Sequence, residues 1–195
     1  MTVRSIFFKR HTLWLPTIWF LVMLLLVLGL TLLLGFRGIA CFLAQTSPQH
    51  GEYLVVEGWQ GEQGLQKALL VFNDPKNNYK YLITTGGPNT QWGGEVWPNY
   101  ADKSANYFVS HGLMAEKLVS IPTPASAQNR TYLSAVMVRD WFAQQSINVN
   151  ELDVFTQGVH ARRTRFLYEL ALPASSIGVY ANEPEGYQLP TWWKN

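Results

Sequence analysis

The feature that most constrains this chain is an uncharged apolar run near its start. The run extends from Thr12 to Phe36 and reads TLWLPTIWFLVMLLLVLGLTLLLGF. A helix needs about 20 such residues to cross a hydrocarbon layer about 30 Å thick, so this run suits a single span with some tilt. Trp14 and Trp19 are expected at the membrane interface on the amino-terminal side. The sequence therefore predicts one transmembrane anchor over residues 12–36.

Cleavable signals are the alternative interpretation of the same run. A secretory signal peptide has an apolar region of only about 7–15 residues, which is shorter than the run found here. A lipoprotein signal ending at Cys41 would have Ala40 before the cysteine, as required. However, Gly38 stands where an aliphatic residue is expected and Arg37 interrupts the apolar region. We therefore interpret the run as an uncleaved anchor.

Basic residues on the two sides of the run predict its orientation. Arg4, Lys9 and Arg10 precede it, whereas only Arg37 follows it closely. By the positive-inside rule, residues 1–11 then lie in the cytoplasm and the rest of the chain lies outside. In a bacterium this predicts an inner (cytoplasmic) membrane protein with a periplasmic or otherwise extracytoplasmic carboxyl-terminal domain.

Charge and cysteine content exclude several classes of function. Four of the 15 basic residues lie up to Arg37 but none of the 13 acidic ones, which leaves the rest of the chain with a net charge of −2. A slightly acidic domain is a poor candidate for nonspecific binding, so we expect no nucleic-acid partner. The single cysteine, Cys41, excludes an intrachain disulfide, and no Cys/His spacing indicates a zinc site.

After a polar linker over residues 37–50, short apolar segments alternate with longer amphipathic ones. The short segments are rich in Val, Ile, Leu and aromatic residues and are bounded by Gly, Pro or Asn, which is typical of strands. They are EYLVVEG (52–58), YKYLITTGG (79–87), KLVSIPT (117–123), LDVFTQG (152–158) and SIGVYAN (176–182).

Segments with helical spacing of apolar residues separate these strands. The first is expected to end at Pro75 and the second at Gly112, and the third spans roughly 129–145. The fourth begins near His160, and its expected buried residues are Phe166, Leu167 and Leu170. Strands alternating with helices are typical of βαβ units. We expect a three-layer, Rossmann-like α/β domain over residues 51–195, with a mostly parallel sheet of about five strands.

Chemically distinctive residues gather where the predicted strands end. In an open parallel sheet, ligands bind outside the carboxyl ends of the strands, close to helix amino termini. The candidate ligand-binding residues of these loops are Glu57, Trp59, Gly86, Gly87, Arg130, Thr131, Thr156, Gln157, His160, Arg162 and Arg163. We predict that they meet in one crevice.

Several of these residues also have plainer interpretations. Gly86 and Gly87 could form an anion-binding nest of backbone N–H groups, but Gly-Gly-Pro after a strand is more often only a turn. Glu57 could be a solvated side chain or a partner of a helix dipole. Arg130 could pair with Asp102 in a purely structural role.

The stretch VFTQGVHARRTRF, over residues 154–166, contains the densest group of cations. Adjacent arginines on a helix cannot all face the same way, so one or two of the three must be solvated. His160 and Arg163 are three residues apart and share a face, whereas Arg165 lies about 200° around the helix from Arg163. Cations at a helix amino terminus oppose the macrodipole, which a bound anion would relieve. We expect Arg163 to bind an oxyanion and His160 to bind it or transfer a proton.

Taken together, these segments resemble the SanA/YdcF/ElyC family of bacterial proteins. LVVEGW is similar to the family's first apolar strand and glycine turn, and ITTGGP to its strand ending in Ser-Gly-Gly. NRTYLSA resembles its helix opening with Asn-Thr, and TQGVHARRT its Thr-Ser-x-x-His-x-x-Arg-Ala motif. Thr156, His160 and Arg163 fall on the Thr, His and Arg of that motif. The resemblance covers essentially the whole domain after the linker.

The chain departs from the family pattern at several positions. Leu133 and Ser134 stand where an acidic residue and an asparagine are expected, and an acid expected before them is replaced within IPTPAS. Glu57 stands where the first motif more often has glycine. The chain thus resembles a divergent branch of the family.

The resemblance implies a role at the cell envelope. Relatives with a single amino-terminal span are linked to peptidoglycan or surface-polysaccharide assembly, and a soluble relative resembles a binder of S-adenosylmethionine. We expect a phosphorylated small molecule or lipid-linked precursor of envelope glycan as ligand; whether hydrolysis or transfer at phosphorus follows binding is left open by the sequence. If it does, Glu57 or His160 would be the acid/base, Arg163 and Arg130 would stabilise developing charge, and Gly86–Gly87 would hold phosphate.

Other functions remain open at this point. The domain could instead be a non-catalytic sensing or scaffold module for an envelope synthase, or a binder of a nucleotide or S-adenosylmethionine. Glu57 and His160 could share a divalent ion, but two ligands from different segments are weak support for a metal. The sequence indicates no particular cofactor.

Overall fold

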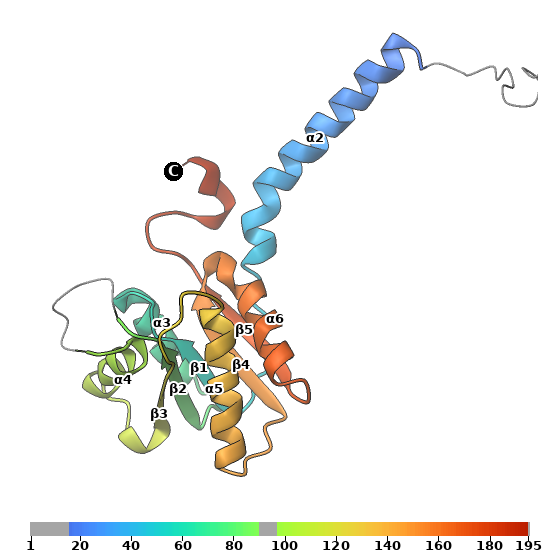
Figure 1. The fold of residues 1–195 in the computed structure, drawn as a ribbon. Coiled ribbons are helices and arrows are strands. Elements are labelled where there is room, and N and C mark those ends of the chain that lie inside the picture. Colours follow the sequence, from blue (N-terminus) through green and yellow to red (C-terminus); the bar gives the residue numbers. More distant parts are fainter. Residues whose placement is uncertain (1–15, 90–96, 195) are drawn as a thin grey trace, which may run out of the picture. The chain divides into compact units, whose positions relative to one another are not determined.

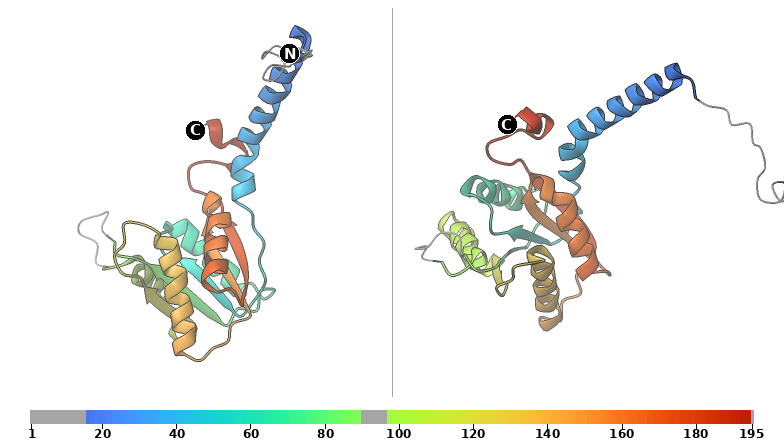
Figure 2. Two further views of the ribbon diagram at one scale, coloured as in Figure 1. Left: turned by 45° about the vertical axis from the view of Figure 1, so that its right-hand side comes forward. Right: turned by 45° about the horizontal axis from the view of Figure 1, so that its top comes forward.

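A computed structural model describes residues 16–89 and 97–194 of the chain. Trp14, the start of the predicted anchor and the segment 1–11, which is expected in the cytoplasm, lie outside the described residues. The chain divides after Arg37 into two units, and each is described here by itself. Figures 1 and 2 draw the chain from three directions.

The amino-terminal apolar run forms the helix α2, Ile18–Leu43. With a mean hydropathy of 2.7 over its most apolar window, it is long and apolar enough to cross a membrane. The helix continues to Leu43, seven residues beyond Phe36, the last residue of the predicted anchor. Arg37 interrupts the apolar run but is compatible with a helix, and the residues up to Leu43 are again mainly apolar.

The second unit contains a five-stranded sheet in which every strand pairing is parallel. Its strands are β1 (Tyr53–Glu57), β2 (Tyr81–Gly86), β3 (Leu118–Pro122), β4 (Glu151–Gln157) and β5 (Ser176–Asn182). Their spatial order is β3-β2-β1-β4-β5. The chain adds β2 and β3 on one side of β1 and then β4 and β5 on its other side, so the topological switch point lies between β1 and β4. The predicted α/β class is therefore confirmed, with a sheet that is wholly rather than mostly parallel.

Helices cover both faces of this sheet (Figure 1). They are α3 (Glu62–Asn73), α4 (Tyr100–Ser110), α5 (Arg130–Gln144) and α6 (Ala161–Ala171), with the 3-10 turns η1 (Ala115–Lys117), η2 (Gly158–His160) and η3 (Leu189–Lys194). The ends follow local chemistry. Pro75 lies just beyond α3, and the Asn99 side chain accepts a 2.7 Å hydrogen bond from the Asp102 N–H at the start of α4.

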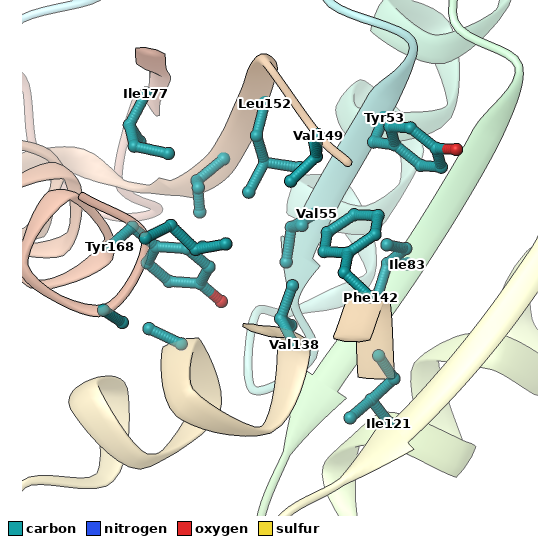
Figure 3. Packing of buried hydrophobic residues seen from close by; sticks show 14 residues of the cluster. Tyr53, Val55, Ile83, Ile121, Val138, Phe142, Val149, Leu152, Tyr168 and Ile177 are labelled. Carbon is teal, nitrogen blue, oxygen red and sulfur yellow. The ribbon is translucent and has the colours of Figure 1, made fainter. Parts of the chain in front are cut away.

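Alternating side chains of each central strand enter two separate cores. Val55 packs into the core beneath α5 and α6, whereas its neighbours Leu54 and Val56 pack beneath α3 and α4. In the first core the Phe142 ring meets the Tyr53 ring edge-on, with centroids 4.9 Å apart (Figure 3). Because both faces are buried, the strand sequences read as continuous apolar runs.

The buried face of α6 differs from the prediction. Phe166 and Leu170 are 61% and 57% exposed, and the fully buried helix residues are Ala161, Thr164, Tyr168 and Ala171. Helix α6 packs against both α5 and β5, and three of these four buried residues are small, which permits close approach. The prediction that the large apolar side chains mark the buried face of α6 is therefore wrong for Phe166 and Leu170.

A buried carboxylate attaches the linker to the domain. Asp153, fully buried in β4, accepts hydrogen bonds from the N–H groups of Gln49 (2.7 Å) and His50 (2.8 Å) and from the Tyr79 hydroxyl (2.6 Å). A Cβ on Gly178 of the neighbouring strand would overlap Asp153 Oδ1. Only glycine fits there, so this carboxylate and its three donors form one structural unit.

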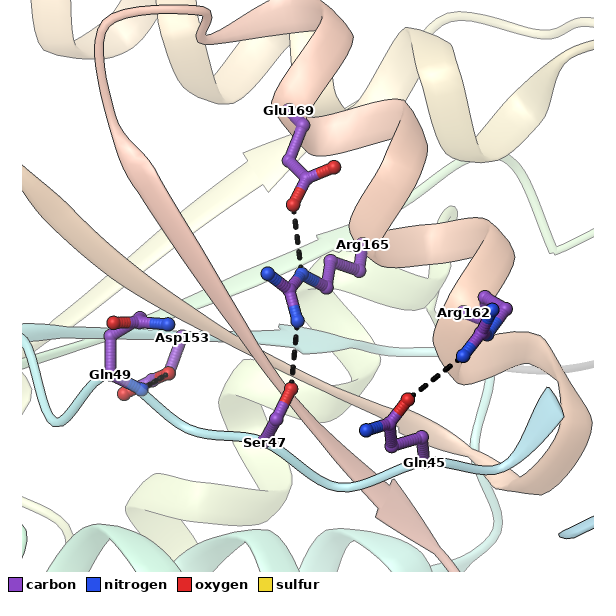
Figure 4. A network of polar contacts seen from close by, with 7 residues as sticks. All are labelled: Gln45, Ser47, Gln49, Asp153, Arg162, Arg165 and Glu169. Carbon is purple, nitrogen blue, oxygen red and sulfur yellow. Dashed lines mark hydrogen bonds and ion pairs between the residues drawn. The ribbon is translucent and has the colours of Figure 1, made fainter. Parts of the chain in front are cut away.

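The linker also covers the outer edge of β5. Ser47 and Val179 exchange two backbone hydrogen bonds in an antiparallel bridge, and the Ala181 N–H donates to the Thr46 hydroxyl. Figure 4 shows this segment running beside the strand. Part of the predicted linker 37–50 is therefore ordered edge structure, which shields a strand that would otherwise offer unpaired backbone groups.

Candidate functional site

A cavity of about 690 Å³ opens at the carboxyl edge of the sheet. Loops after β1, β2 and β3 and the first turns of α5 and α6 surround it. Helix amino termini meet at this edge in parallel α/β sheets, which makes it the usual ligand site. The predicted site residues that line the cavity are Glu57, Trp59, Gly86, Gly87, Arg130, Thr131, His160 and Arg163.

Glu57, the last residue of β1, forms part of the cavity wall while only 3% exposed. Its carboxylate accepts a hydrogen bond from the Thr156 hydroxyl of β4. Burial raises the pKa of Glu57 above its usual range, against the opposing effects of hydrogen bonding from Thr156, Trp59 and Thr131 and of the Arg163 charge. Glu57 is thus neither the solvated acid nor the simple dipole partner considered above.

Arg130 and Arg163 bring two cationic side chains to this cavity. Arg130 is the first residue of α5, and Arg163 lies in the first turn of α6. Neither guanidinium forms a hydrogen bond or ion pair within residues 16–89 and 97–194. Asp102, the structural partner considered for Arg130, accepts hydrogen bonds from Asn99 and Ser120 instead. Both arginines are therefore available to a ligand.

His160 and Trp59 form an aromatic corner of the cavity. Their ring centroids are 5.3 Å apart and the rings meet edge to face, with an interplanar angle of 69°. Burial and the nearby charge of Arg163 lower the pKa of His160. The neutral imidazole is favoured, so His160 is suited to accept a proton or a hydrogen bond rather than to supply a permanent charge.

Gly86 and Gly87, for which an anion-binding nest and a plain turn were both considered, line the cavity. Gly86 still belongs to β2, and its carbonyl accepts a 3.1 Å hydrogen bond from the Thr123 N–H. The Gly87 carbonyl accepts a 2.9 Å bond from the Tyr100 N–H, and a Cβ on Gly86 would lie 2.6 Å from the Tyr100 Cβ. Gly86 therefore allows the start of α4 to approach closely, whereas a Cβ on Gly87 would lie 3.1 Å from the Thr123 hydroxyl oxygen.

The remaining predicted residues lie outside the cavity lining. Thr156 is fully buried behind Glu57, and Gln157 is half-buried at the end of β4. Arg162 donates a 2.9 Å hydrogen bond to Gln45 Oε1 (Figure 4). Its guanidinium also lies over the Phe42 ring. Arg162 therefore does not share a site with Arg163.

Arg165 occupies the place that helical spacing predicts for it. It donates hydrogen bonds of 2.8 Å to Glu169 and 2.9 Å to Ser47, away from the cavity (Figure 4). His160 and Arg163 line the cavity together, as their spacing of three residues predicts. Only one of the three clustered arginines thus faces the cavity.

Sequence reasoning missed several residues of the lining. Thr85 and Ser134 contribute hydroxyl groups, and Tyr100 contributes a ring at the start of α4. Thr85 is 1% exposed and its hydroxyl has no hydrogen-bond partner in the described part of the chain. Two signals could have found these residues: Thr85 directly precedes the glycine pair, and Ser134 lies one helical turn after Arg130.

Neither a metal-binding cluster nor a matching protein family identifies the ligand of this cavity. Among the described residues, no group of three or more His, Cys, Asp or Glu side chains could hold a metal ion. No protein-family model matches the chain, and no curated protein matches it.

Proposed function

We propose that this chain is a membrane-anchored envelope protein whose cavity binds a phosphate-bearing ligand. The observation that carries the proposal is the pair of arginines, Arg130 and Arg163, which line one cavity and form no ion pair in the described residues. Arg139 and Arg165, by contrast, pair with the acidic residues Asp140 and Glu169. Two unpaired guanidinium groups are suited to bind a tetrahedral oxyanion.

Further groups favour phosphate and a larger attached moiety. The first turn of α5 adds backbone N–H groups beside Arg130 and Thr131, and such groups favour anions. The cavity volume of about 690 Å³ falls in the range of sites for drug-sized ligands, so a phosphate would leave room for the group it is attached to. Trp59 and Tyr100 offer ring surface to that group.

The cellular assignment rests on the anchor and on the family resemblance. A helix with the length and apolarity of α2 would hold the cavity close to a membrane, where lipid-linked precursors of peptidoglycan or surface polysaccharide are found. The flanking basic residues favour an inner-membrane protein with an extracytoplasmic domain. A reporter fused to the carboxyl terminus tests this orientation: cytoplasmic reporter activity would contradict it.

If the bound phosphate reacts, the cavity offers groups for hydrolysis or transfer. Glu57 has a raised pKa and is suited to act as an acid, and neutral His160 is suited to act as a base. Arg130 and Arg163 would stabilise charge that develops on the phosphoryl oxygens. Thr156 would orient Glu57 through its hydrogen bond.

A non-catalytic sensing or scaffold module is the second candidate. Glu57 is the only carboxylate among the described lining residues, and Leu133 and Ser134 stand where the family that the chain resembles has an acid and an asparagine. Loss of a catalytic acid would leave a binding site without turnover. A nucleotide or S-adenosylmethionine-type ligand belongs to this candidate and would place a ring against Trp59.

A panel of phosphomonoesters, phosphodiesters and pyrophosphates separates the two candidates. The full chain in detergent is expected to release phosphate from at least one compound, and Glu57→Gln is expected to abolish that release. Glu116→Gln, an exposed acid in η1, is the matched control and should leave turnover unchanged. A raised melting temperature without turnover would instead favour the sensing module. No turnover and no thermal shift with any compound would refute phosphate binding itself.

A further inference from the structure

Glu57 stands in an unusual place for a site that binds anions. Among the residues that the structure describes, it is the only acidic one that lines the cavity, and it is almost completely buried there. An ionised carboxylate would repel a phosphate held by Arg130 and Arg163, because both negative charges would share one desolvated space. The site therefore needs an explanation for this acid.

The groups that face Glu57 are donors, cations or neutral side chains. Thr156 of β4 donates to the carboxylate, and hydrogen bonding from Trp59 and Thr131 also favours its ionised form. From α6, Arg163 supplies a positive charge, and His160 in the same turn prefers its neutral form.

Tyr168 of α6 approaches the same carboxyl group from within the core. It is fully buried, and this burial, together with the nearby Glu57 charge, raises the pKa of its hydroxyl. Tyr168 is therefore neutral. Among the described residues that line the cavity, Arg130 and Arg163 each carry one positive charge. The net charge of this lining then depends only on whether Glu57 is ionised or protonated.

We propose that the ligand group bound here is a dianionic phosphate, as in a phosphomonoester, and that Glu57 carries a proton in the complex and donates a hydrogen bond to a phosphate oxygen. This inference rests on the proposed function. With Glu57 neutral, two guanidinium charges match the two charges of a monoester, whereas a diester brings only one. The proton comes from the solvent and forms the O–H bond of the Glu57 carboxyl group, and no bond of the phosphate forms or breaks.

The arrangement of donors supports this assignment. A phosphate dianion has only acceptor oxygens, so each group around it must be a donor. The two arginines fulfil this requirement, and Glu57 fulfils it only when protonated. Burial already raises the pKa of this carboxyl in the free protein, and a bound dianion would raise it further.

Proton uptake on binding tests the inference. Sulfate is the probe, because it is a tetrahedral dianion that does not titrate near neutral pH, so any proton taken up enters the protein. Calorimetric titration of the full chain in detergent, in two buffers of different ionisation enthalpy, gives the protons bound per sulfate at each pH from 6 to 9. The uptake is expected to rise towards one as pH rises, while the affinity falls by up to about tenfold per pH unit.

Two variants assign that proton. Glu57→Gln keeps the shape and a donor but cannot titrate, so sulfate should bind with no proton uptake and with an affinity that does not change with pH. His160→Gln should leave the uptake of the wild-type chain unchanged. At pH 8, methyl phosphate should bind at least about tenfold more tightly than dimethyl phosphate, as expected for one additional charge-assisted hydrogen bond.

Each other result overturns the inference. Sulfate binding without proton uptake, or uptake that is lost in His160→Gln and kept in Glu57→Gln, would show that Glu57 holds no proton in the complex. Equal affinities for methyl and dimethyl phosphate would refute the dianion assignment. Both outcomes would leave the proposed phosphate site intact, whereas failure of every one of these anions to bind would refute the proposed function as well. If Glu57→Gln does not fold, the wild-type and His160→Gln measurements still decide.

Discussion

Truncation of Arg163 to Ala should separate ligand binding from fold stability. Its guanidinium lines the cavity and has no hydrogen bond or ion pair in the described residues, so the free protein loses little when it is removed. We expect the free energy of unfolding to change by less than about 0.5 kcal/mol. A charged hydrogen bond contributes about 1.5–3 kcal/mol, so phosphate affinity should fall by roughly 10- to 150-fold.

Arg165→Ala is the matched control, and it should show the opposite pattern. Arg165 binds Glu169 and Ser47 away from the cavity, and its ion pair is more than a third exposed. Because solvent screens this ion pair, Arg165→Ala should lower the free energy of unfolding by at most about 1 kcal/mol. The free energy of phosphate binding should change by only a few tenths of a kcal/mol. Isothermal titration with inorganic phosphate and urea unfolding on the same samples measure both quantities. Equal losses of affinity in the two variants, or unfolding of Arg163→Ala, would refute the assignment of Arg163 to the site.

Four further predictions concern the fold and the buried acid. Asp153→Ala should lower the free energy of unfolding by at least about 3 kcal/mol, because three hydrogen bonds to a buried carboxylate are lost; a smaller loss in urea unfolding would contradict the role of Asp153. Gly178→Ala should destabilise by at least about 2 kcal/mol in the same assay, since its Cβ would overlap that carboxylate. Phe142→Ala should lower the free energy of unfolding by about 3–5 kcal/mol, because it leaves a cavity in a closed core. A near-neutral result in urea unfolding would mean that the core around Tyr53 collapses and fills this cavity. Because the pKa of Glu57 is raised in the folded chain, the folded state binds more protons than the unfolded state between the two pKa values. Stability should therefore fall as pH rises through that interval, by at most about 1.4 kcal/mol per pH unit. Glu57→Gln should remove this slope in urea unfolding from pH 4.5 to 8, and an unchanged slope would assign it to another group.

The strands and the layer order could be predicted because each signal is local. Val and Ile runs that end at Gly or Pro have few alternatives to a buried strand, and helices between them require parallel pairing. The edge of the sheet that holds the cavity follows from the same topology. This is why Glu57, Arg130 and Arg163 could be expected in one place although they are far apart in the sequence.

Other features depend on packing that no single segment specifies. In α6, Phe166 and Leu170 have helical spacing, but so do Ala161, Thr164, Tyr168 and Ala171, which are buried. The close approach of α6 to α5 and β5 decides between the two faces, and it selects small side chains. Arg162 could not be separated from Arg163 for a similar reason, because its partners Gln45 and Phe42 lie far away in the sequence.

The raised pKa of Glu57 also could not be predicted from the sequence. Its charge state depends on the degree of burial and on donors from Thr156 and Thr131, which come from different elements. The loop that closes the cavity between β3 and α5 has no regular pattern, so its residues, Pro124 to Ala127, could not be assigned to the lining.

The central claim is that Arg130 and Arg163 together bind phosphate, and one titration tests it most directly. Inorganic phosphate is titrated into the wild-type chain, into the Arg130→Ala/Arg163→Ala double variant, and into Arg139→Ala, an exposed arginine of α5 that pairs with Asp140. We predict saturable binding at one site in the wild type and in Arg139→Ala, and an affinity at least about 100-fold lower in the double variant, since two charged hydrogen-bonding groups are removed. Absence of binding to the wild type, or equal affinity of the double variant and the wild type, would contradict the claim.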